Sequence, residues 1–298
     1  MNGEHVGVIG LGAMGRGMAG SLRRAGCTVH VCDARAEVAE AFAHEGGVAC
    51  ANPAEVARDC PVVISVVVDG AQTEDVLFGV QGAAAAMAPG SVFVMCSTVD
   101  PTVSIGFETR LAVLGVGYLD APISGGAAKA ASGQMTIMGA GRAESWARCA
   151  PLLDAMAARV YRLGDCAGNG SKVKIINQLL AGVHIAAAAE AMALGLREGV
   201  DPQQLYDVIT HSAGNSWMFE NRMPHVLAGD YTPLSAVDIF VKDLGLVLDT
   251  ARASKFPLPL ASTAHQMFMH ASSAGHGRDD DAAVIRMFPG IELPAAKP

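Results

Sequence analysis

The sequence predicts an α/β domain that is joined by a long helix to an all-α C-terminal domain. Short β-like runs alternate with helical segments through the first half of the 298 residues, and a long helical pattern without proline follows. Beyond that helix the chain has only helix-type patterns, which proline or glycine interrupts. We therefore expect a first domain over residues 1–165 and a helical second domain over 166–298.

The alternating half predicts a largely parallel sheet with helices on both faces, because parallel neighbours require crossover connections. The expected strands are His5–Gly10, Thr28–Asp33, Val62–Val68, Ser91–Met95, Gly117–Ala121, Gln134–Met138 and Arg159–Arg162. Helical patterns fall between most of them, at Met14–Ala25, Arg35–His44 and Thr102–Leu114. The long helix is expected from Ser171 to about Glu198, with Gly199 as its stop signal.

Composition narrows the class of protein. Hydrophobic residues make up 51% and charged residues 17% of the chain, which suits a well-buried enzyme and argues against disorder. The net charge of -8 argues against a nucleic-acid partner. The seven cysteines form no CxxC pair, so we expect reduced thiols and a cytoplasmic location. The apolar run Leu179–Leu194 contains His184 and Glu190, so we interpret it as a buried helix and expect no membrane span.

A glycine-rich loop follows the first expected strand and opens the first helix. Its sequence is Gly10-Leu11-Gly12-Ala13-Met14-Gly15. In such a loop Gly10 allows the tight turn, Gly12 lets the backbone approach a pyrophosphate, and Gly15 lets helix and strand pack closely. The helix N-terminus then offers free N–H groups to the phosphates. This context predicts a Rossmann-type dinucleotide-binding domain.

Asp33 ends the second expected strand, about twenty residues beyond the loop, where an acidic residue bonds the ribose 2′-hydroxyl. A carboxylate there repels a 2′-phosphate and favours NAD over NADP. Arg35 lies two residues on and could accommodate that phosphate, so the preference for NAD is small.

A second turn at the end of a strand has the chemistry of an anion site. In Asp120–Gly126, Ser124 offers a hydroxyl, and Gly125 and Gly126 let backbone N–H groups converge. A substrate carboxylate would suit this turn, although an ordinary turn would look the same by itself.

Lys174 shares a face of the long helix with Asn177 and Gln178. Oxidation of an alcohol requires removal of the hydroxyl proton as the hydride leaves, and a positioned lysine can accept it. A free lysine has a pKa near ~10.4, so this role needs surroundings that favour the neutral amine. Two alternatives stay open: a permanently charged lysine that binds carboxylate, and a solvated lysine on an exposed face.

Four motifs in this order resemble the β-hydroxyacid dehydrogenase family, which includes the 3-hydroxyisobutyrate dehydrogenases. They are Gly10 to Gly15 with Ala19, Asp120 to Gly126, Gly168-x-Gly170-x-x-x-Lys174-x-x-Asn177, and Lys242-Asp243-Leu244. The resemblance covers nearly the whole chain. It implies an oxidoreductase in which Lys174 is the catalytic general acid/base. The nine histidines contain no HExxH pattern, so we expect no metal site.

The resemblance also implies two sets of binding residues. The expected cofactor-binding residues are Gly10, Leu11, Gly12, Ala13, Met14, Gly15, Asp33, Val67, Val68, Thr98 and Lys242. The expected substrate-binding residues are Ser124, Gly125, Gly126, Asn177, Gln178, Asn215 and Phe219. Val67 and Val68 replace the usual Leu-Pro pair of relatives, which leaves the adenosine-side contacts open.

The substrate is narrowed by the helical domain, which resembles a branch of the family that oxidises the C2 hydroxyl of a four-carbon sugar acid. The run Ala213–Arg222 is polar with an aromatic pair, which suits a polyhydroxylated acid, and Gln178 stands where 3-hydroxyisobutyrate enzymes have an asparagine. The alternatives are 3-hydroxyisobutyrate or tartronate semialdehyde as substrate, and a catalytically inactive nucleotide-binding module. An imine reductase is disfavoured because such enzymes usually lack the lysine. The family and the apolar long helix favour a homodimer or homotetramer.

Overall fold

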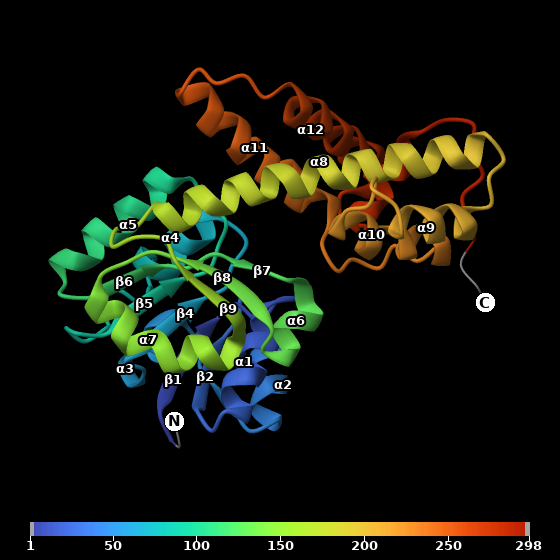
Figure 1. Cartoon of the computed structure of the whole chain (residues 1–298). Helices are drawn as coiled ribbons and strands as arrows, with labels where there is room; N and C mark the ends of the chain where they lie inside the picture. Colours follow the sequence, from blue (N-terminus) through green and yellow to red (C-terminus); the bar gives the residue numbers. More distant parts are fainter. Residues whose placement is uncertain (1–2, 296–298) are drawn as a thin grey trace. The chain divides into compact units, whose positions relative to one another are not determined.

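A computed structural model describes residues 3–295 of the chain (Figure 1). The chain divides into two compact units, the first ending at Lys174 and the second beginning at Ile175. This division falls inside a single long helix, α8 (Asn169–Arg197), which the sequence predicted from Ser171 to about Glu198.

The first unit contains a six-stranded sheet of order β3-β2-β1-β4-β5-β6 in which every neighbouring pair is parallel. Its strands are β1 (His5–Ile9), β2 (Thr28–Cys32), β3 (Val48–Ala49), β4 (Val62–Ser65), β5 (Val92–Met95) and β6 (Gly117–Asp120). The strand order reverses between β1 and β4. In open parallel sheets ligands bind outside the carboxyl ends of the strands at such a reversal.

Helices cover both faces of this sheet. They are α1 (Gly15–Arg24), α2 (Ala36–His44), α3 (Pro53–Asp59), α4 (Gly70–Phe78), α5 (Pro101–Val113), α6 (Gly126–Ser132) and α7 (Ala143–Met156). Along β5, Val92 and Val94 join the core cluster that α1, α2 and α7 also fill, whereas Phe93 and Met95 join the cluster filled by α3, α4 and α5. Successive side chains of a strand point to opposite faces, so both faces are buried and the strands are almost continuously apolar.

Two of the expected strands do not join the parallel sheet. β8 (Met135–Gly139) and β9 (Ala157–Arg162) form a separate three-stranded sheet with β7 (Ile123–Ser124), in which β7 and β8 are antiparallel. Between β6 and β7 lies Pro122, which has no N–H to continue the ladder of β6. Its carbonyl instead accepts the N–H of Met138 at 2.9 Å.

The second unit is helical, as the sequence predicted. After α8 come α9 (Pro202–Thr210), α10 (Trp217–Ala228), α11 (Val237–Ala253) and α12 (Pro259–Ala271), then a π-helical turn (Ser272–His276) and a 3₁₀ helix (Asp281–Met287). A separate core cluster packs these helices together. Local sequence fixes several helix starts, because a side chain at the N-cap accepts a backbone N–H of the first turn. These caps are Asn52, Asp69, Asp100, Asp201 and Ser216.

Candidate active site

The three glycines of the loop after β1 have different structural roles. Gly10 has φ +91°, and a Cβ there would lie 2.7 Å from the carbonyl oxygen of Val66. A Cβ on Gly15 would lie 1.9 Å from the carbonyl oxygen of Gly10, so only glycine lets α1 start so close to β1. Around Gly12 nothing lies within 4 Å of such a Cβ. The first and last glycines therefore shape the loop, and Gly12 leaves room for a group that approaches the backbone.

Asp33 lies directly after β2 and is bound to the same loop. Its Oδ2 accepts the N–H of Leu11 at 2.7 Å, and its Oδ1 accepts the N–H of Arg35 at 3.0 Å. The Arg35 guanidinium also lies 3.4 Å from Oδ1. Burial raises the pKa of Asp33, but these hydrogen bonds and the guanidinium outweigh it and leave the pKa below its usual value. The loop is therefore flanked by an ionised carboxylate.

An open cleft of about 530 Å³ lies beside the loop, and four arginines and one glutamate line it with small residues. Arg16 and Arg23 both pair with Glu45, while Arg24 donates to a backbone carbonyl of α6. Arg35 is the fourth arginine. The cleft is thus positive on a chain of net charge -8, and its guanidinium groups already have protein partners.

The remaining predicted cofactor residues of the first unit lie at the same edge of the sheet. Val67 and Val68 follow β4, and Thr98 follows β5. Val67 packs against a core cluster, whereas Val68 is 45% exposed. All the predicted cofactor residues of the first unit follow carboxyl ends of parallel strands. The sheet therefore places residues that are far apart in the sequence at one edge.

The predicted anion turn connects β7 to α6. Ser124 is the last residue of β7, and Gly125 and Gly126 have φ of +139° and +78°. Both angles lie in the region that favours glycine, which explains the pair at this position. A Cβ on Gly126 would meet no atom within 4 Å, so its surroundings are open.

Lys174 lies in the first turns of α8 and is only 7% exposed. This burial excludes the simplest alternative, a solvated lysine on an exposed helix face. Gln178, one turn further, is 8% exposed, and its Oε1 accepts a hydrogen bond from Asn177 at 3.0 Å.

In the second unit, Asp243 of α11 joins the two predicted amides to the predicted cofactor lysine. The amide of Gln178 donates to Asp243 Oδ2 at 2.5 Å, and Lys242 Nζ lies 2.6 Å from Asp243 Oδ1. Sequence reasoning used Asp243 only as part of a motif and gave it no role. The position of Asp243 directly after Lys242 was the signal for a role. Its contact with Gln178 of α8, however, is visible only in the structure.

Two predicted substrate residues in α9–α10 have contacts inside the second unit. Phe219 is 3% exposed and stacks on Tyr206 with ring centroids 5.9 Å apart. The side-chain amide of Asn215 donates to the carbonyl of Thr210 and to Glu220 Oε1, at 3.2 and 2.6 Å. Both residues therefore help to hold α9 against α10.

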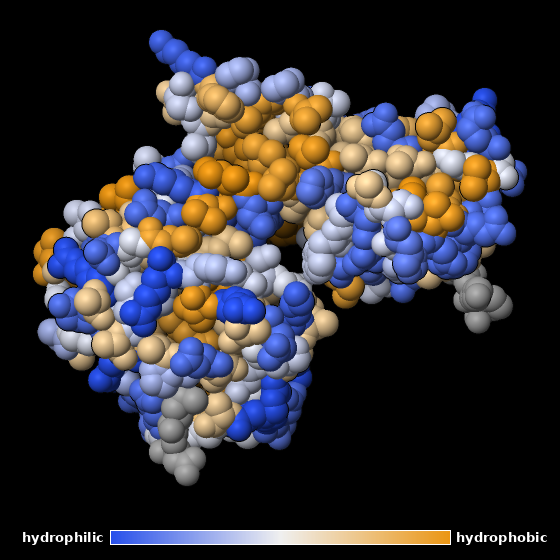
Figure 2. Space-filling view, in the orientation of Figure 1, coloured by the Kyte–Doolittle hydropathy of each residue, from blue (hydrophilic) through white to orange (hydrophobic). Residues whose placement is uncertain are grey.

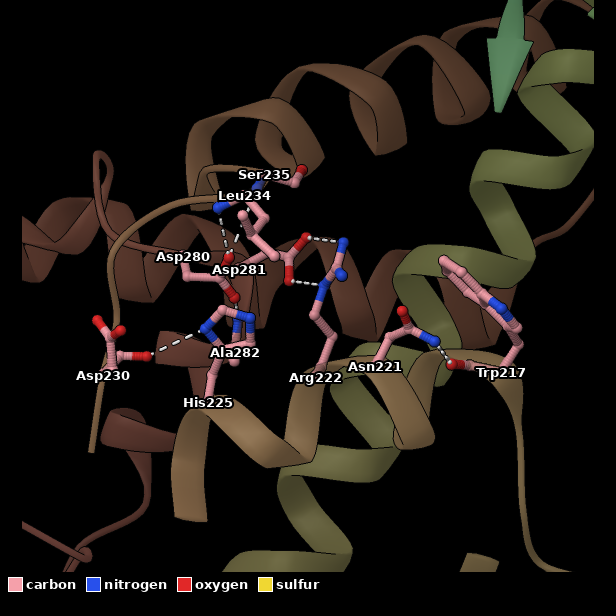
Figure 3. A network of polar contacts seen from close by, with 10 residues as sticks. All are labelled: Trp217, Asn221, Arg222, His225, Asp230, Leu234, Ser235, Asp280, Asp281 and Ala282. Atoms are coloured by element: carbon pink, nitrogen blue, oxygen red, sulfur yellow. Dashed lines mark hydrogen bonds and ion pairs between the residues drawn. The ribbon is translucent and has the colours of Figure 1, made fainter. Parts of the chain in front are cut away.

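Arg222, which the sequence offered as a further group for substrate hydroxyls or carboxylate, is bound to protein instead. Its Nε and Nη2 lie 2.5 and 3.2 Å from the two oxygens of the buried Asp281 (Figure 3). The neighbouring Asp280 accepts the backbone N–H groups of Leu234 and Ala282. This network fastens α10 to the 3₁₀ helix. Among residues 3–295, no group of three or more His, Cys, Asp or Glu side chains is arranged to hold a metal ion.

A glycine loop after β1, an acidic residue after β2 and a parallel sheet with this strand order define a dinucleotide-binding domain of the Rossmann type. Residues 5–164 match the model of the NAD-binding domain of 6-phosphogluconate dehydrogenase. Residues 168–288 match the NAD-binding model of NADP-dependent 3-hydroxyisobutyrate dehydrogenase. The chain belongs to the 3-hydroxyisobutyrate dehydrogenase family and is an NAD(P)-dependent hydroxyacid dehydrogenase. The family and the fold class predicted from the sequence are both confirmed.

Individual relatives agree with this assignment over almost the full length. The L-threonate dehydrogenase of Cupriavidus necator is 68% identical over 291 residues, 98% of each chain. The L-threonate dehydrogenase of Escherichia coli K12 is 52% identical over 98% of this chain and 97% of its own. A crystal structure described as 3-hydroxyisobutyrate dehydrogenase from Salmonella typhimurium is 53% identical, with a TM-score of 0.92, and covers 96% of this chain and 100% of its own.

Proposed function

We propose that the chain oxidises L-threonate at its C2 hydroxyl to 2-dehydro-L-erythronate, with NAD as the hydride acceptor. The observation that carries this proposal is the 68% identity, over 98% of both chains, to a protein named L-threonate dehydrogenase. A second candidate substrate, 3-hydroxyisobutyrate, is favoured by the name of the Salmonella structure at 53% identity.

The buried Lys174 is the proposed general base. In the forward direction its amine takes the C2 hydroxyl proton, and in the reverse direction the ammonium returns it. The cofactor supplies the hydride acceptor. The proposed role of Ser124, Gly125 and Gly126 is to hold the substrate carboxylate, and that of Asn177 and Gln178 is to bond substrate hydroxyls and orient the lysine. Asn215 and Phe219 complete the proposed substrate set by resemblance to the family.

The residues of the first unit fit a dinucleotide. The open space at Gly12 suits a pyrophosphate close to the backbone, and Asp33 has the charge that suits ribose hydroxyls. We propose NAD because the ionised Asp33 opposes a 2′-phosphate, whereas the nearby Arg35 is already paired with it. In the second unit the proposed cofactor contact is Lys242. An Asp33→Ala variant should lower the ratio of kcat/KM with NAD to that with NADP by at least about tenfold. A wild-type preference for NADP would overturn the choice.

The substrate is tested by initial rates with C3–C5 hydroxy acids and sugar acids, each with NAD and with NADP. L-threonate with NAD should give the highest kcat/KM. Activity with 3-hydroxyisobutyrate and none with L-threonate would replace the first candidate by the second.

The catalytic assignment is tested with a matched pair of lysine variants. Lys174→Ala should lower kcat by about a hundredfold or more, while the affinity for NAD stays within about twofold. Lys172→Ala is the control, because Lys172 is an exposed lysine of the same helix. A Lys174→Ala enzyme with near-normal kcat would remove the lysine from the chemistry.

We also propose a homodimer or homotetramer. Val173, Ile176, Leu180 and Leu194 are exposed along α8 at spacings that place them on one stripe of the helix. Figure 2 shows apolar surface over the region that α8 occupies in Figure 1. A Leu180→Glu variant should lower the mass measured by light scattering, whereas Val208→Glu, a change at an exposed residue of α9, should not. A monomeric wild-type protein would refute the proposal.

A further inference from the structure

We propose that Asp120 is a positioning residue, whose buried carboxylate clamps the start of α8 to the end of β6 and thereby places Lys174. This inference rests on the proposed function of Lys174. It concerns the first unit alone, which includes both Asp120 and Lys174.

The carboxylate of Asp120 has no exposed surface and is surrounded by donors from the start of α8. Its Oδ2 accepts the N–H groups of Gly168 and Ser171 at 2.8 and 2.9 Å, and its Oδ1 accepts the Ser171 hydroxyl at 2.7 Å. The first N–H groups of a helix have no partner within the helix, and this carboxylate satisfies them from a residue 48 to 51 positions earlier.

The glycine pattern before α8 is what this approach requires. Gly168 has φ +93°, which favours glycine. A Cβ on Gly170 would lie 2.4 Å from the carbonyl oxygen of Met138 and 2.6 Å from that of Asp120. Any side chain at 170 would therefore push the helix start away from β6. Gly168, Gly170 and Ser171 therefore let the start of α8 lie directly against the Asp120 carboxylate.

Asp120 connects the two parts of the site that the first unit contributes. The chain leaves it through Ala121 and Pro122 to reach Ser124, the start of the proposed carboxylate turn. On the other side Ser171 precedes Lys174 by three residues, which is about one helical turn of 3.6 residues. Fixing Ser171 therefore fixes the origin of the lysine side chain, and misplacement by about 1 Å can cost about a hundredfold in rate.

The charge of Asp120 gives it a second influence. Burial raises the pKa of Asp120 above its usual value, and the hydrogen bonds from Ser171 and Gly168 oppose this only in part. The neighbouring titratable groups are Tyr118, Cys96 and Glu108. Burial raises the pKa of both Tyr118 and Cys96, so both are neutral near pH 7. When Asp120 is ionised, it places a negative charge on Ser171, one helical turn before Lys174, and such a charge favours the protonated amine.

The experiment compares Asp120→Asn, Ser171→Ala and Asp201→Asn with the wild type, using kcat, KM for both substrates and the pH profile of kcat/KM. Asp120→Asn should lower kcat by about tenfold or more, with KM for NAD within about twofold. The acid limb of the pH profile of this variant should move to lower pH, because a negative charge near the amine of Lys174 is removed. Ser171→Ala loses one hydrogen bond and no charge. Its kcat should therefore fall less than that of Asp120→Asn, and the acid limb of its pH profile should lie at the wild-type pH. Asp201 caps α9 in the other unit, and its variant should keep the wild-type kcat.

Amide hydrogen exchange measures the clamp without any turnover. The N–H groups of Gly168 and Ser171 should exchange at least about tenfold faster in Asp120→Asn, because their acceptor is weakened. If that variant fails to fold, Ser171→Ala carries the test through its kcat. The proposal is overturned if kcat per folded molecule is unchanged in both variants, or if kcat falls while exchange and pH profile stay as in the wild type. A wild type inactive on every hydroxy acid would instead reject the proposed function, and the exchange experiment would still decide the clamp.

Discussion

Alanine substitutions at Gly12 and Gly15, in the loop after β1, should impair different properties of the protein. In Gly15→Ala the new methyl group would lie 1.9 Å from a backbone oxygen of Gly10, which cannot rotate away. In Gly12→Ala the methyl group meets no protein atom within 4 Å, and the backbone is not in the left-handed region. The first change should therefore damage the fold, and the second should damage only the binding of the dinucleotide.

The structure gives the size of each effect. Forcing an overlap of more than 1 Å costs about 1–3 kcal/mol or more, and each kcal/mol lowers Tm by about 2–4 °C in a protein of this size. We expect Gly15→Ala to lose at least about 3 °C in Tm without cofactor. Gly12→Ala should keep its Tm or gain slightly. Alanine lowers the conformational entropy of the unfolded chain, and this stabilises the folded state by about 0.4–1 kcal/mol. Its Kd for NAD should rise by about tenfold or more, which is about 1.4 kcal/mol.

Thermal unfolding with and without NAD, combined with calorimetric titration, separates the two effects. At an NAD concentration about 100 times the wild-type Kd, binding stabilises the wild type by about 2.7 kcal/mol. A tenfold weaker Kd reduces this to about 1.4 kcal/mol, so the NAD-induced rise in Tm of Gly12→Ala should be about half the wild-type rise. The reasoning would be refuted by a Gly12→Ala protein that binds NAD normally, or by a Gly15→Ala protein with wild-type Tm.

Three further predictions follow from other contacts. Burial raises the pKa of Asp281 from 3.8 to about 7 against the opposing Arg222, so the folded state holds the proton more tightly and this group's contribution to stability is lost as pH rises from about 4 to about 7. Urea unfolding at several pH values should show that slope, and Asp281→Asn should flatten it; an unchanged slope contradicts the assignment. Cys166 is the one exposed cysteine of the seven, so a thiol reagent should modify one group rapidly in the native protein and none in Cys166→Ser. Asn52 caps α3 by accepting the N–H of Glu55 at 2.9 Å, and Asn52→Ala should cost about 0.5–2 kcal/mol in the free energy of unfolding, while no loss would show that the cap is dispensable.

The sequence alone determined the features that depend on neighbouring residues. The glycine loop, its position between β1 and α1, and Asp33 after β2 all appear where the pattern placed them. The predicted ends of the long helix differ by two residues at its start and one at its end. Such features follow from short-range rules, since turns, caps and periodicity are set within a few residues.

The tertiary structure decided which distant residues meet. Asp120 joins Ser171 across 51 positions, and Gln178 joins Asp243 across 65. The transfer of β8 and β9 to a second sheet likewise depends on pairing with β7, and the two-residue strand β3 has too little local signal to be recognised. The local patterns of one sequence do not reveal these long-range pairings, because many tertiary arrangements would satisfy the same local patterns. For the lysine at the centre of the proposal, the sequence supplied the residue and its helix, and the fold supplied the buried carboxylate that fixes where the helix begins.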